Sequence, residues 1–171
     1  MASDPAVLEA LPHRPPFLFV DRIIDRTESS IVTEWHVPHD LECFKGHYPG
    51  HPVLPGVIAC EFTFQSAAIF FTDPCSKKAA PGSIPVLARI EEARFKKVVQ
   101  PGETLLAEVE LEESLPNVRY MRARVSSNGE IVLRLKFVVA LSQHGSIDAA
   151  ARKSSSAKGH ATRALHRERE E

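Results

Sequence analysis

The chain has 171 residues, a length that suits one domain with a short appendage. Its 43% apolar content supports a buried core, and its net charge of −1 gives no electrostatic reason to expect binding to nucleic acid or to an anionic membrane. The three cysteines are an odd number and form no CxxC pair, which argues against a disulfide framework and against a structural zinc site.

The first predicted elements are a β-hairpin and a helix. Phe17–Ile24 is dense in apolar and β-branched residues, Asp25–Ser30 has the composition of a turn, and Ile31–Val37 alternates with strand periodicity. Residues 38–55 are rich in proline, glycine and histidine, which disfavours regular structure. Pro55–Thr72 is long enough for a helix and begins with a residue favoured in the first turn. Because this segment is apolar almost all round, we expect it to be buried.

Further strands are predicted after the helix. Pro101-Gly102 and Asn128-Gly129 separate apolar runs, and Asn-Gly in this setting is a strong hairpin signal. Strands, one buried helix and more strands predict an α+β fold, in which an antiparallel sheet wraps around a single long helix. The predicted strands are Ile84–Lys97, Glu103–Glu113, Val118–Ser127 and Ile131–Leu141.

The two ends of the chain carry little apolar sequence. Residues 1–16 hold acids and prolines where a signal peptide has an apolar segment, and the apolar helix is interrupted by Glu61 and Gln65, so we expect a cytoplasmic protein. From about residue 142 the chain is polar, with charges of both signs. We therefore predict a domain over residues 1–141 and a disordered polar tail over residues 142–171.

Glu61 and Gln65 are four residues apart and therefore share one face of the predicted helix. Glu61 lies too far into the helix to be a capping acid. A carboxylate in apolar surroundings must be hydrogen-bonded, protonated or lining a cavity, and burial raises its pKa, which is the condition for a general acid near neutral pH. The alternative is that Glu61 faces solvent or pairs with a distant arginine.

His47 lies in a run of glycine and proline residues that can hold its ring in one orientation, as a general base requires. The alternative is a loop histidine without a function. His47 and His51 have the i, i+4 spacing of metal ligands, but that spacing aligns ligands only on a helix, which Pro49 and Gly50 disfavour, so we expect no metal. Gly56 begins the helix, where unpaired amides can stabilise an oxyanion, although it can equally be an ordinary glycine at a helix start.

The segment 46–65, GHYPGHPVLPGVIACEFTFQ, is similar to the signature G-H-F-P-G-x-P-x-x-P-G-V-x-x-x-E-x-x-x-Q of the bacterial 3-hydroxyacyl-[acyl-carrier-protein] dehydratases. Residues 11–22, with LPHR, PFL and VDR, resemble the opening of that family. Residues 93–103, with ARF, VV and PGE, resemble its strand pair after the helix. The resemblance covers residues 11–141 in the same order and at the same spacings.

The resemblance implies a FabZ-like hot-dog enzyme of fatty acid or related lipid biosynthesis, with His47 as base, Glu61 as acid and the Gly56 amide stabilising the oxyanion. It implies a substrate bound to acyl carrier protein, no cofactor, and a homodimer or trimer of dimers in which the histidine of one protomer faces the glutamate of the other. From the spacing alone, Gln65 is expected to hydrogen-bond and orient Glu61.

An apolar tunnel at the dimer contact is expected to hold the acyl chain. For each aromatic residue considered as a wall, ordinary core packing is the alternative. Acidic carrier protein is a candidate partner for Arg94, Lys96 and Lys97, and an ordinary solvated face is the alternative reading of these residues. The candidate substrate-binding residues are Gln65, Tyr48, Val57, Phe62, Phe64 and Phe95, with Phe70 as a further candidate wall.

The sequence departs from the family pattern at several places, and the stretch from Leu115 to Tyr120 and the tail after Leu141 match it poorly. Phe62-Thr63-Phe64 is bulkier than the family's usual Ala-Met-Ala and is expected to shorten or redirect the tunnel, and Tyr48 replaces a phenylalanine. Two other functions remain open at this point. A hot-dog thioesterase would need a carboxylate that activates water or attacks the carbonyl. The His47–Glu61 pair fits this mechanism less well than it fits dehydration. A non-catalytic module that binds acyl chains or scaffolds a complex would need neither residue.

Overall fold

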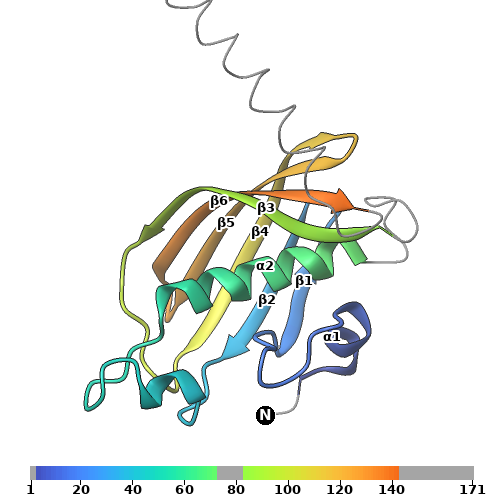
Figure 1. Ribbon diagram of the computed structural model, residues 1–171. Helices are drawn as coiled ribbons and strands as arrows, with labels where there is room; N and C mark the ends of the chain where they lie inside the picture. The colour runs from blue at the N-terminus through green and yellow to red at the C-terminus, as the bar shows by residue number, and fades with distance from the viewer. Residues whose placement is uncertain (1–2, 73–82, 143–171) are drawn as a thin grey trace, which may run out of the picture.

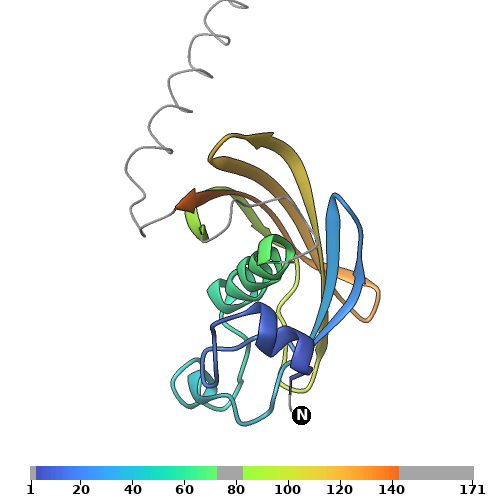
Figure 2. The same ribbon diagram turned by 90° about the vertical axis from the view of Figure 1, so that its right-hand side faces the viewer.

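A computed structural model of the protein describes residues 3–72 and 83–142. Six strands form one antiparallel sheet in the order β1-β2-β4-β5-β6-β3, and this sheet curves around the long helix α2 (Figures 1 and 2). The short helix α1 packs beside α2 and β1. The elements are α1 Pro5–Ala10, β1 Arg22–Arg26, β2 Ser30–His36, the 3-10 helix η1 Glu42–Lys45, α2 Gly56–Thr72, β3 Ile84–Phe95, β4 Thr104–Leu115, β5 Val118–Ser127 and β6 Glu130–Ser142.

The predicted α+β architecture is confirmed, including the buried helix and the four strands that follow it, whose ends differ from the prediction by at most two residues. The Asn-Gly turn lies between β5 and β6, and Asn128 and Gly129 both have positive φ, at 52° and 79°, as a tight hairpin requires. The predicted tail lies outside the described residues except for Ser142. Among residues 3–72 and 83–142 no helix is long and apolar enough to cross a membrane.

The prediction of a strand over Phe17–Ile24 is wrong at both ends. The strand begins at Arg22 and continues to Arg26, with an irregularity between Ile23 and Asp25. The amide of Phe19 donates to the side chain of Gln65 over 2.9 Å instead of pairing with a strand, because this part of the chain lies against α2. Apolar density alone does not distinguish a strand from a buried extended segment. Here the hydrogen bonds show that the chain before Arg22 is an extended segment bound to α2 and not part of the strand.

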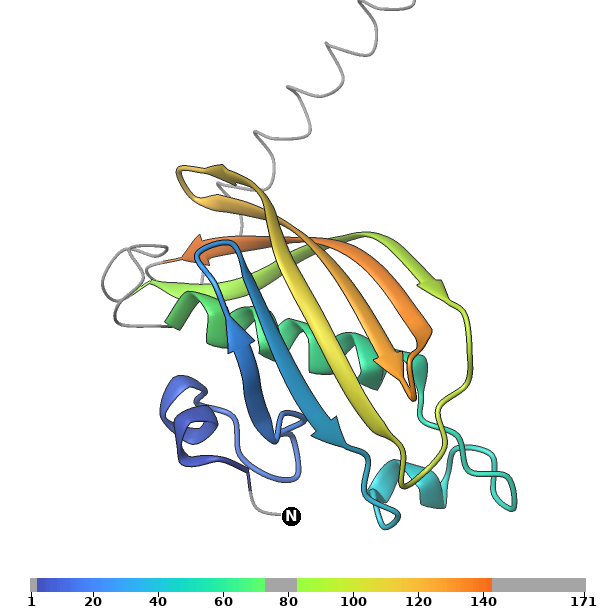
Figure 3. The same cartoon turned by 180° about the vertical axis from the view of Figure 1, so that it is seen from behind.

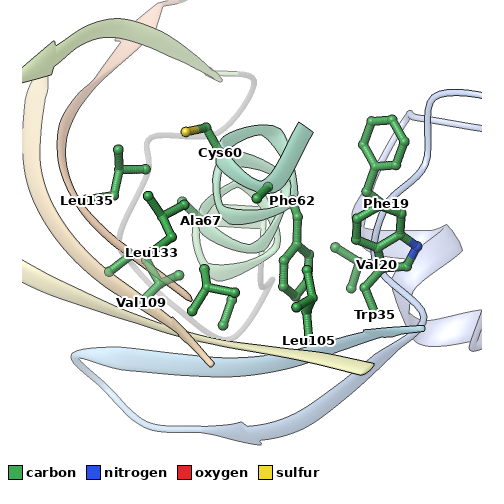
Figure 4. Packing of buried hydrophobic residues seen from close by; sticks show 14 of the residues in the cluster. Phe19, Val20, Trp35, Cys60, Phe62, Ala67, Leu105, Val109, Leu133 and Leu135 are labelled. Atoms are coloured by element: carbon green, nitrogen blue, oxygen red, sulfur yellow. The ribbon is translucent and has the colours of Figure 1, made fainter. Parts of the chain in front are cut away.

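The hydrophobic core lies between α2 and the concave face of the sheet (Figure 4). Leu105, Ala107 and Val109 alternate with exposed residues along β4, so one face of that strand is buried. Phe62 is fully buried against Trp35, with ring centroids 5.8 Å apart. Burial of this continuous apolar layer fixes which side of α2 faces the sheet.

The convex face of the sheet, which is turned toward the viewer in Figure 3, carries charged cross-strand pairs and a small second hydrophobic cluster of Val118, Tyr120 and Val138, and β3 ends the sheet. Cross-strand pairs on it include Arg122 with Glu110 at 2.6 Å and Arg124 with Glu108 at 3.0 Å, all of them more than a third exposed. Such exposed pairs add little stability. The edge strand β3 pairs only with β6 among the described strands, and several large apolar side chains along or beside it are exposed: Ile84, Leu87, Ile90, Phe95 and Val98.

Candidate active site

His47 lies on the loop between η1 and α2, and this loop is held at several points. The His47 amide donates to the Cys43 carbonyl over 2.9 Å, and the Leu54 amide donates to the Val99 carbonyl over 2.8 Å. Between them the chain turns sharply, with φ of 55° at Tyr48 and 88° at Gly50. The glycine and proline residues therefore build an ordered turn around the histidine, and residues 38–55, predicted to lack regular structure, contain only the short 3-10 helix η1.

The imidazole of His47 has a defined tautomer. Its Nδ1 lies 2.8 Å from the carbonyl oxygen of Val53, which only accepts hydrogen bonds, so Nδ1 carries the proton and donates it. In the neutral ring Nε2 is therefore unprotonated and able to accept a proton. The Tyr48 ring packs edge-on against the imidazole, with centroids 4.7 Å apart. This is the arrangement that a general base needs.

His47 shares a cavity of about 380 Å³ with the beginning of α2. Gly56 and Val57 line it, together with Tyr48 and Phe95. The first amides of a helix have no partner within the helix and lie at the positive end of its dipole, so they can stabilise a developing negative charge here. A Cβ added at Gly56 would lie 2.7 Å from Cε1 of Phe95, so this ring packs directly on the glycine.

Glu61 lies in a second, smaller cavity of about 200 Å³, which Phe64 and Gln65 also line. Gln65 Nε2 donates to Glu61 Oε1 over 3.1 Å, which confirms the hydrogen bond predicted from their spacing. The same side chain accepts from the Phe19 amide over 2.9 Å and donates to the Phe17 carbonyl over 3.3 Å. Gln65 thus fixes the Glu61 carboxyl and also ties the segment before β1 to α2.

Burial raises the pKa of Glu61 above its ordinary value, against smaller opposing effects of the Gln65 hydrogen bond and of the charge on His13. The cause is that a carboxylate loses hydration in a partly apolar cavity while the neutral acid does not. A raised pKa retains the proton closer to neutral pH, so Glu61 is suited to donate a proton. The solvent-facing alternative does not describe this residue, because its carboxyl is half-buried and hydrogen-bonded.

The structure brings His47 together with Gly56, Tyr48, Val57 and Phe95, and it brings Glu61 together with Gln65 and Phe64, but the two groups line separate cavities. The helix explains this separation. Gly56 and Glu61 are about 7.5 Å apart along the helix axis and roughly 140° apart around it, so they face different sides. A single chain therefore does not present His47 and Glu61 in one cavity.

Phe62 and Phe70, which were candidate tunnel walls with core packing as the alternative, are core residues with no exposed surface. Phe62 faces the sheet because it lies about 100° around the helix from Glu61. Phe64 is half-buried, packs edge-on against Phe137 with centroids 5.1 Å apart, and remains the aromatic residue beside the acid. Helical periodicity places Phe62 and Phe64 on different faces of the helix, but it does not say which of these faces is buried.

Sequence reasoning gave no role to His13, which lines the Glu61 cavity. The only feature of the sequence that could have pointed to His13 was its place in the LPHR run, which resembles the opening of the dehydratase family. Two of the candidate carrier-binding cations already have acidic neighbours: Arg94 pairs with Glu92, and Lys97 with Glu130.

The thiol of Cys60 is buried, and its pKa is raised to about 11 by burial and by the adjacent Glu61, so it is a neutral thiol. Cys75 lies outside the described residues. His47 and His51 lie on a non-helical loop, and the described part of the chain contains no group of three or more His, Cys, Asp or Glu that could hold a metal ion.

The chain matches the ApeI-like family model, described as ApeI dehydratase, over residues 23–131. A 3-hydroxyacyl-[acyl-carrier-protein] dehydratase FabZ from Dechloromonas aromatica is 37% identical over 135 residues, which cover 78% of this chain and 94% of the relative. The FabZ of Clostridium perfringens is 38% identical over 125 residues, which cover 73% and 88% of the two chains.

Solved structures show the same fold. The dehydratase heterocomplex ApeI:P from Xenorhabdus doucetiae has a TM-score of 0.67 at 18% identity and covers 81% of this chain and 91% of that chain. A hypothetical thioesterase with coenzyme A from Streptococcus pneumoniae has a TM-score of 0.56 at 12% identity, with coverage of 71% and 84%. At these identities the likeness concerns the fold alone. The fold and the sequence relatives together define a hot-dog protein of the dehydratase class. The chain belongs to the family of FabZ and ApeI-like dehydratases.

Proposed function

We propose that the protein dehydrates (3R)-3-hydroxyacyl thioesters on acyl carrier protein to trans-2-enoyl thioesters, in fatty acid or related lipid biosynthesis. The FabZ relatives, which cover most of this chain, support the substrate class by their names. The observation that carries the mechanism is the His47 ring, whose Nδ1 bond to Val53 leaves Nε2 free to accept a proton beside the start of α2.

The proposed reaction breaks two bonds of the substrate. His47 Nε2 takes the proton from C2, which the thioester makes acidic, and the Gly56 amide stabilises the enolate-like oxygen. Glu61 gives its proton to the C3 hydroxyl, the C3–O bond breaks, water leaves, and C2 and C3 become doubly bonded. The proton on His47 must then be lost and Glu61 must be reprotonated before the next turnover. No electrons and no group pass to a carrier, so the reaction requires no cofactor.

The proposed site is shared between two copies of the chain, with His47 of one copy facing Glu61 of the other. The separation of the two residues into different cavities supports this arrangement. The edge strand β3 supports it too, because its exposed apolar residues and one-sided pairing make it suitable for pairing with a second copy. A homodimer would hold two such sites, and a trimer of dimers would be a further stage of assembly.

Acyl carrier protein is the proposed partner. Lys96 and Lys97 are the best placed of the three candidate cations, because both are exposed, Lys97 lines the His47 cavity, and Lys96 adjoins Phe95, which also lines it. The pairs of Arg94 with Glu92 and of Lys97 with Glu130 would have to open, or these residues would contribute less. The cytoplasmic location expected from the sequence stays a prediction.

The test is an assay of the purified full chain with 3-hydroxybutyryl and crotonyl thioesters of coenzyme A and of carrier protein. Interconversion of the two is expected, and release of free thiol alone would indicate a thioesterase and contradict the proposal. His47→Ala and Glu61→Gln are each expected to lower the rate by about 10²–10⁴-fold, the usual contribution of a positioned base or acid. Glu28→Gln, on the turn between β1 and β2, is the matched control and should keep the parent rate.

A further inference from the structure

The cavity around Glu61 is closed on one side by the segment between α1 and β1. The other walls come from α2, from β3 and from β6, which contribute only apolar side chains apart from Glu61 and Gln65. His13 lies on the closing segment and, with Glu61, is the only ionisable residue among the described residues that line this cavity. The acid therefore has one ionisable neighbour within its own cavity.

The imidazole of His13 has an unsatisfied polar atom. Its Nδ1 is buried and has no hydrogen-bond partner among the described residues. Nearly all buried polar atoms in proteins have a partner, so a buried ring nitrogen without one calls for an explanation. An apolar residue of similar size would fill the same space without leaving this atom unpaired, and the position therefore has a feature that packing alone does not account for.

The segment that carries His13 is held in place. Arg14 Nη1 donates to the Leu11 carbonyl over 2.7 Å, and its Nη2 donates to the Leu8 carbonyl over 3.0 Å. On the far side of His13, Gln65 bonds to Phe17 and Phe19. Since Gln65 also bonds to Glu61, one side chain fixes both the carboxyl and the segment that faces it.

We propose that His13 is a positioning residue of the active site, whose imidazole stabilises the Glu61 carboxylate that remains after the proton has been given to the departing hydroxyl. This role rests on the proposed function. An ionised carboxylate in a partly apolar cavity is unfavourable on its own, and the imidazole of His13, when it carries a proton, offsets part of that cost. His13 also gives the carboxylate a fixed neighbour in the interval before Glu61 is reprotonated.

The electrostatics of the site agree with this role. The positive charge on His13 lowers the pKa of Glu61, in opposition to burial, which has the larger effect and raises it. Among residues 3–72 and 83–142, the carboxyl also has the neutral amide of Gln65 and the thiol of Cys60 nearby, and this thiol stays protonated at neutral pH. His13 is therefore the neighbour whose removal changes the charge around Glu61.

The experiment follows the Glu61 carboxyl directly, in the full chain labelled with ¹³C at the glutamate side-chain carboxyls. The Glu61 resonance is identified by its absence from the Glu61→Gln variant. His13→Gln removes the charge and keeps hydrogen-bonding ability, His13→Lys restores a cation, and His36→Gln on β2 is the matched control histidine. Each variant is titrated by NMR, its thermal unfolding is measured, and its turnover of 3-hydroxybutyryl thioester is assayed.

In His13→Gln the pKa of Glu61 is expected to be higher than in the parent, and kcat is expected to fall roughly ten-fold, the scale of one charge-assisted interaction. His13→Lys should return the Glu61 titration toward that of the parent, and His36→Gln should change neither quantity. An unchanged Glu61 titration in His13→Gln would overturn the proposal, whether or not kcat had fallen. A parent chain without dehydratase activity would instead contradict the proposed function, and the titration would still decide the coupling between His13 and Glu61.

Discussion

Gln65 lies one helical turn beyond Glu61 and donates a hydrogen bond to its carboxyl over 3.1 Å. Its remaining bonds run to the backbone of Phe17 and Phe19, so a buried side chain in the middle of α2 links the proposed acid to a segment more than forty residues earlier in the chain. The stability of this segment and the geometry of the acid therefore depend on the same residue.

Gln65→Ala should destabilise the protein by about 2–4 kcal/mol, because it leaves the buried Phe19 amide without its partner and also removes the bond to the Phe17 carbonyl. Urea unfolding measures this loss. The control is Gln100→Ala at an exposed position, which should stay within about 0.5 kcal/mol of the parent. Equal effects of the two substitutions would show that Gln65 does not hold the segment.

Stability should depend on pH through Glu61. Burial raises the pKa of this carboxyl in the folded state, so the folded protein binds the proton more tightly than the unfolded chain does. The resulting stability is present below the unfolded pKa and is lost as pH rises through the folded pKa. Glu61→Gln does not ionise, so its free energy of unfolding should increase relative to the parent across that interval and then level off.

Urea unfolding of the parent and of Glu61→Gln at a series of pH values measures this difference. Glu28→Gln, at an exposed position, serves as the control, and its difference from the parent should not follow the same course. A difference for Glu61→Gln that is constant from acid to neutral pH would mean that the Glu61 carboxyl ionises equally easily in the folded and unfolded states.

Mixed dimers should recover activity that neither single variant has. If His47 of one copy acts with Glu61 of the other, a dimer of one His47→Ala chain and one Glu61→Gln chain holds one intact site and one doubly altered site. Random pairing of equal amounts makes half of the dimers mixed, which corresponds to about a quarter of the parent activity. Co-expression of the two chains and assay of the purified mixture tests this.

Failure to recover activity in the mixed preparation, with mixed dimers shown to be present, would place both residues of each site in one chain. The control is a co-expression of two His47→Ala chains that differ only in their purification tags. Its dimers hold no intact site and should remain inactive.

Phe64→Ala should raise the rate with longer acyl chains relative to short ones, because Phe64 is the half-buried aromatic residue beside Glu61 in a cavity of about 200 Å³. We expect kcat/KM for an eight-carbon thioester to increase roughly ten-fold relative to the four-carbon substrate, the scale of a few methylene contacts. The measurement is kcat/KM across a series of chain lengths.

Phe62→Ala is the contrasting variant for this series. Its side chain is fully buried against Trp35, so it should lose about 3–5 kcal/mol of stability without a comparable change in chain-length preference. The same change of preference in both variants would mean that loosening of α2, and not the opening of the Glu61 cavity, sets the preference.

Local sequence determined the long helix and most of the strands of this protein, but not α1, η1 or the bounds of β1. The apolar segment from Gly56 to Thr72, the Asn-Gly turn and the alternation along β2 each reflect a short-range pattern, namely helix start chemistry, positive φ or a period of two. These patterns were sufficient to predict an antiparallel sheet around one helix, and the helical spacing was sufficient to predict the bond between Gln65 and Glu61.

Only the tertiary structure decided which long-range partners these residues have. Phe62 packs in the core against Trp35, whereas Phe64 packs against Phe137 and lies beside Glu61 in the small cavity. In the folded chain Gln65 bonds to the segment before β1, and His13 lies in the wall of the Glu61 cavity. Neither the bonds of Gln65 to the segment before β1 nor the place of His13 follows from periodicity. Contacts between residues far apart in sequence depend on how the whole chain packs.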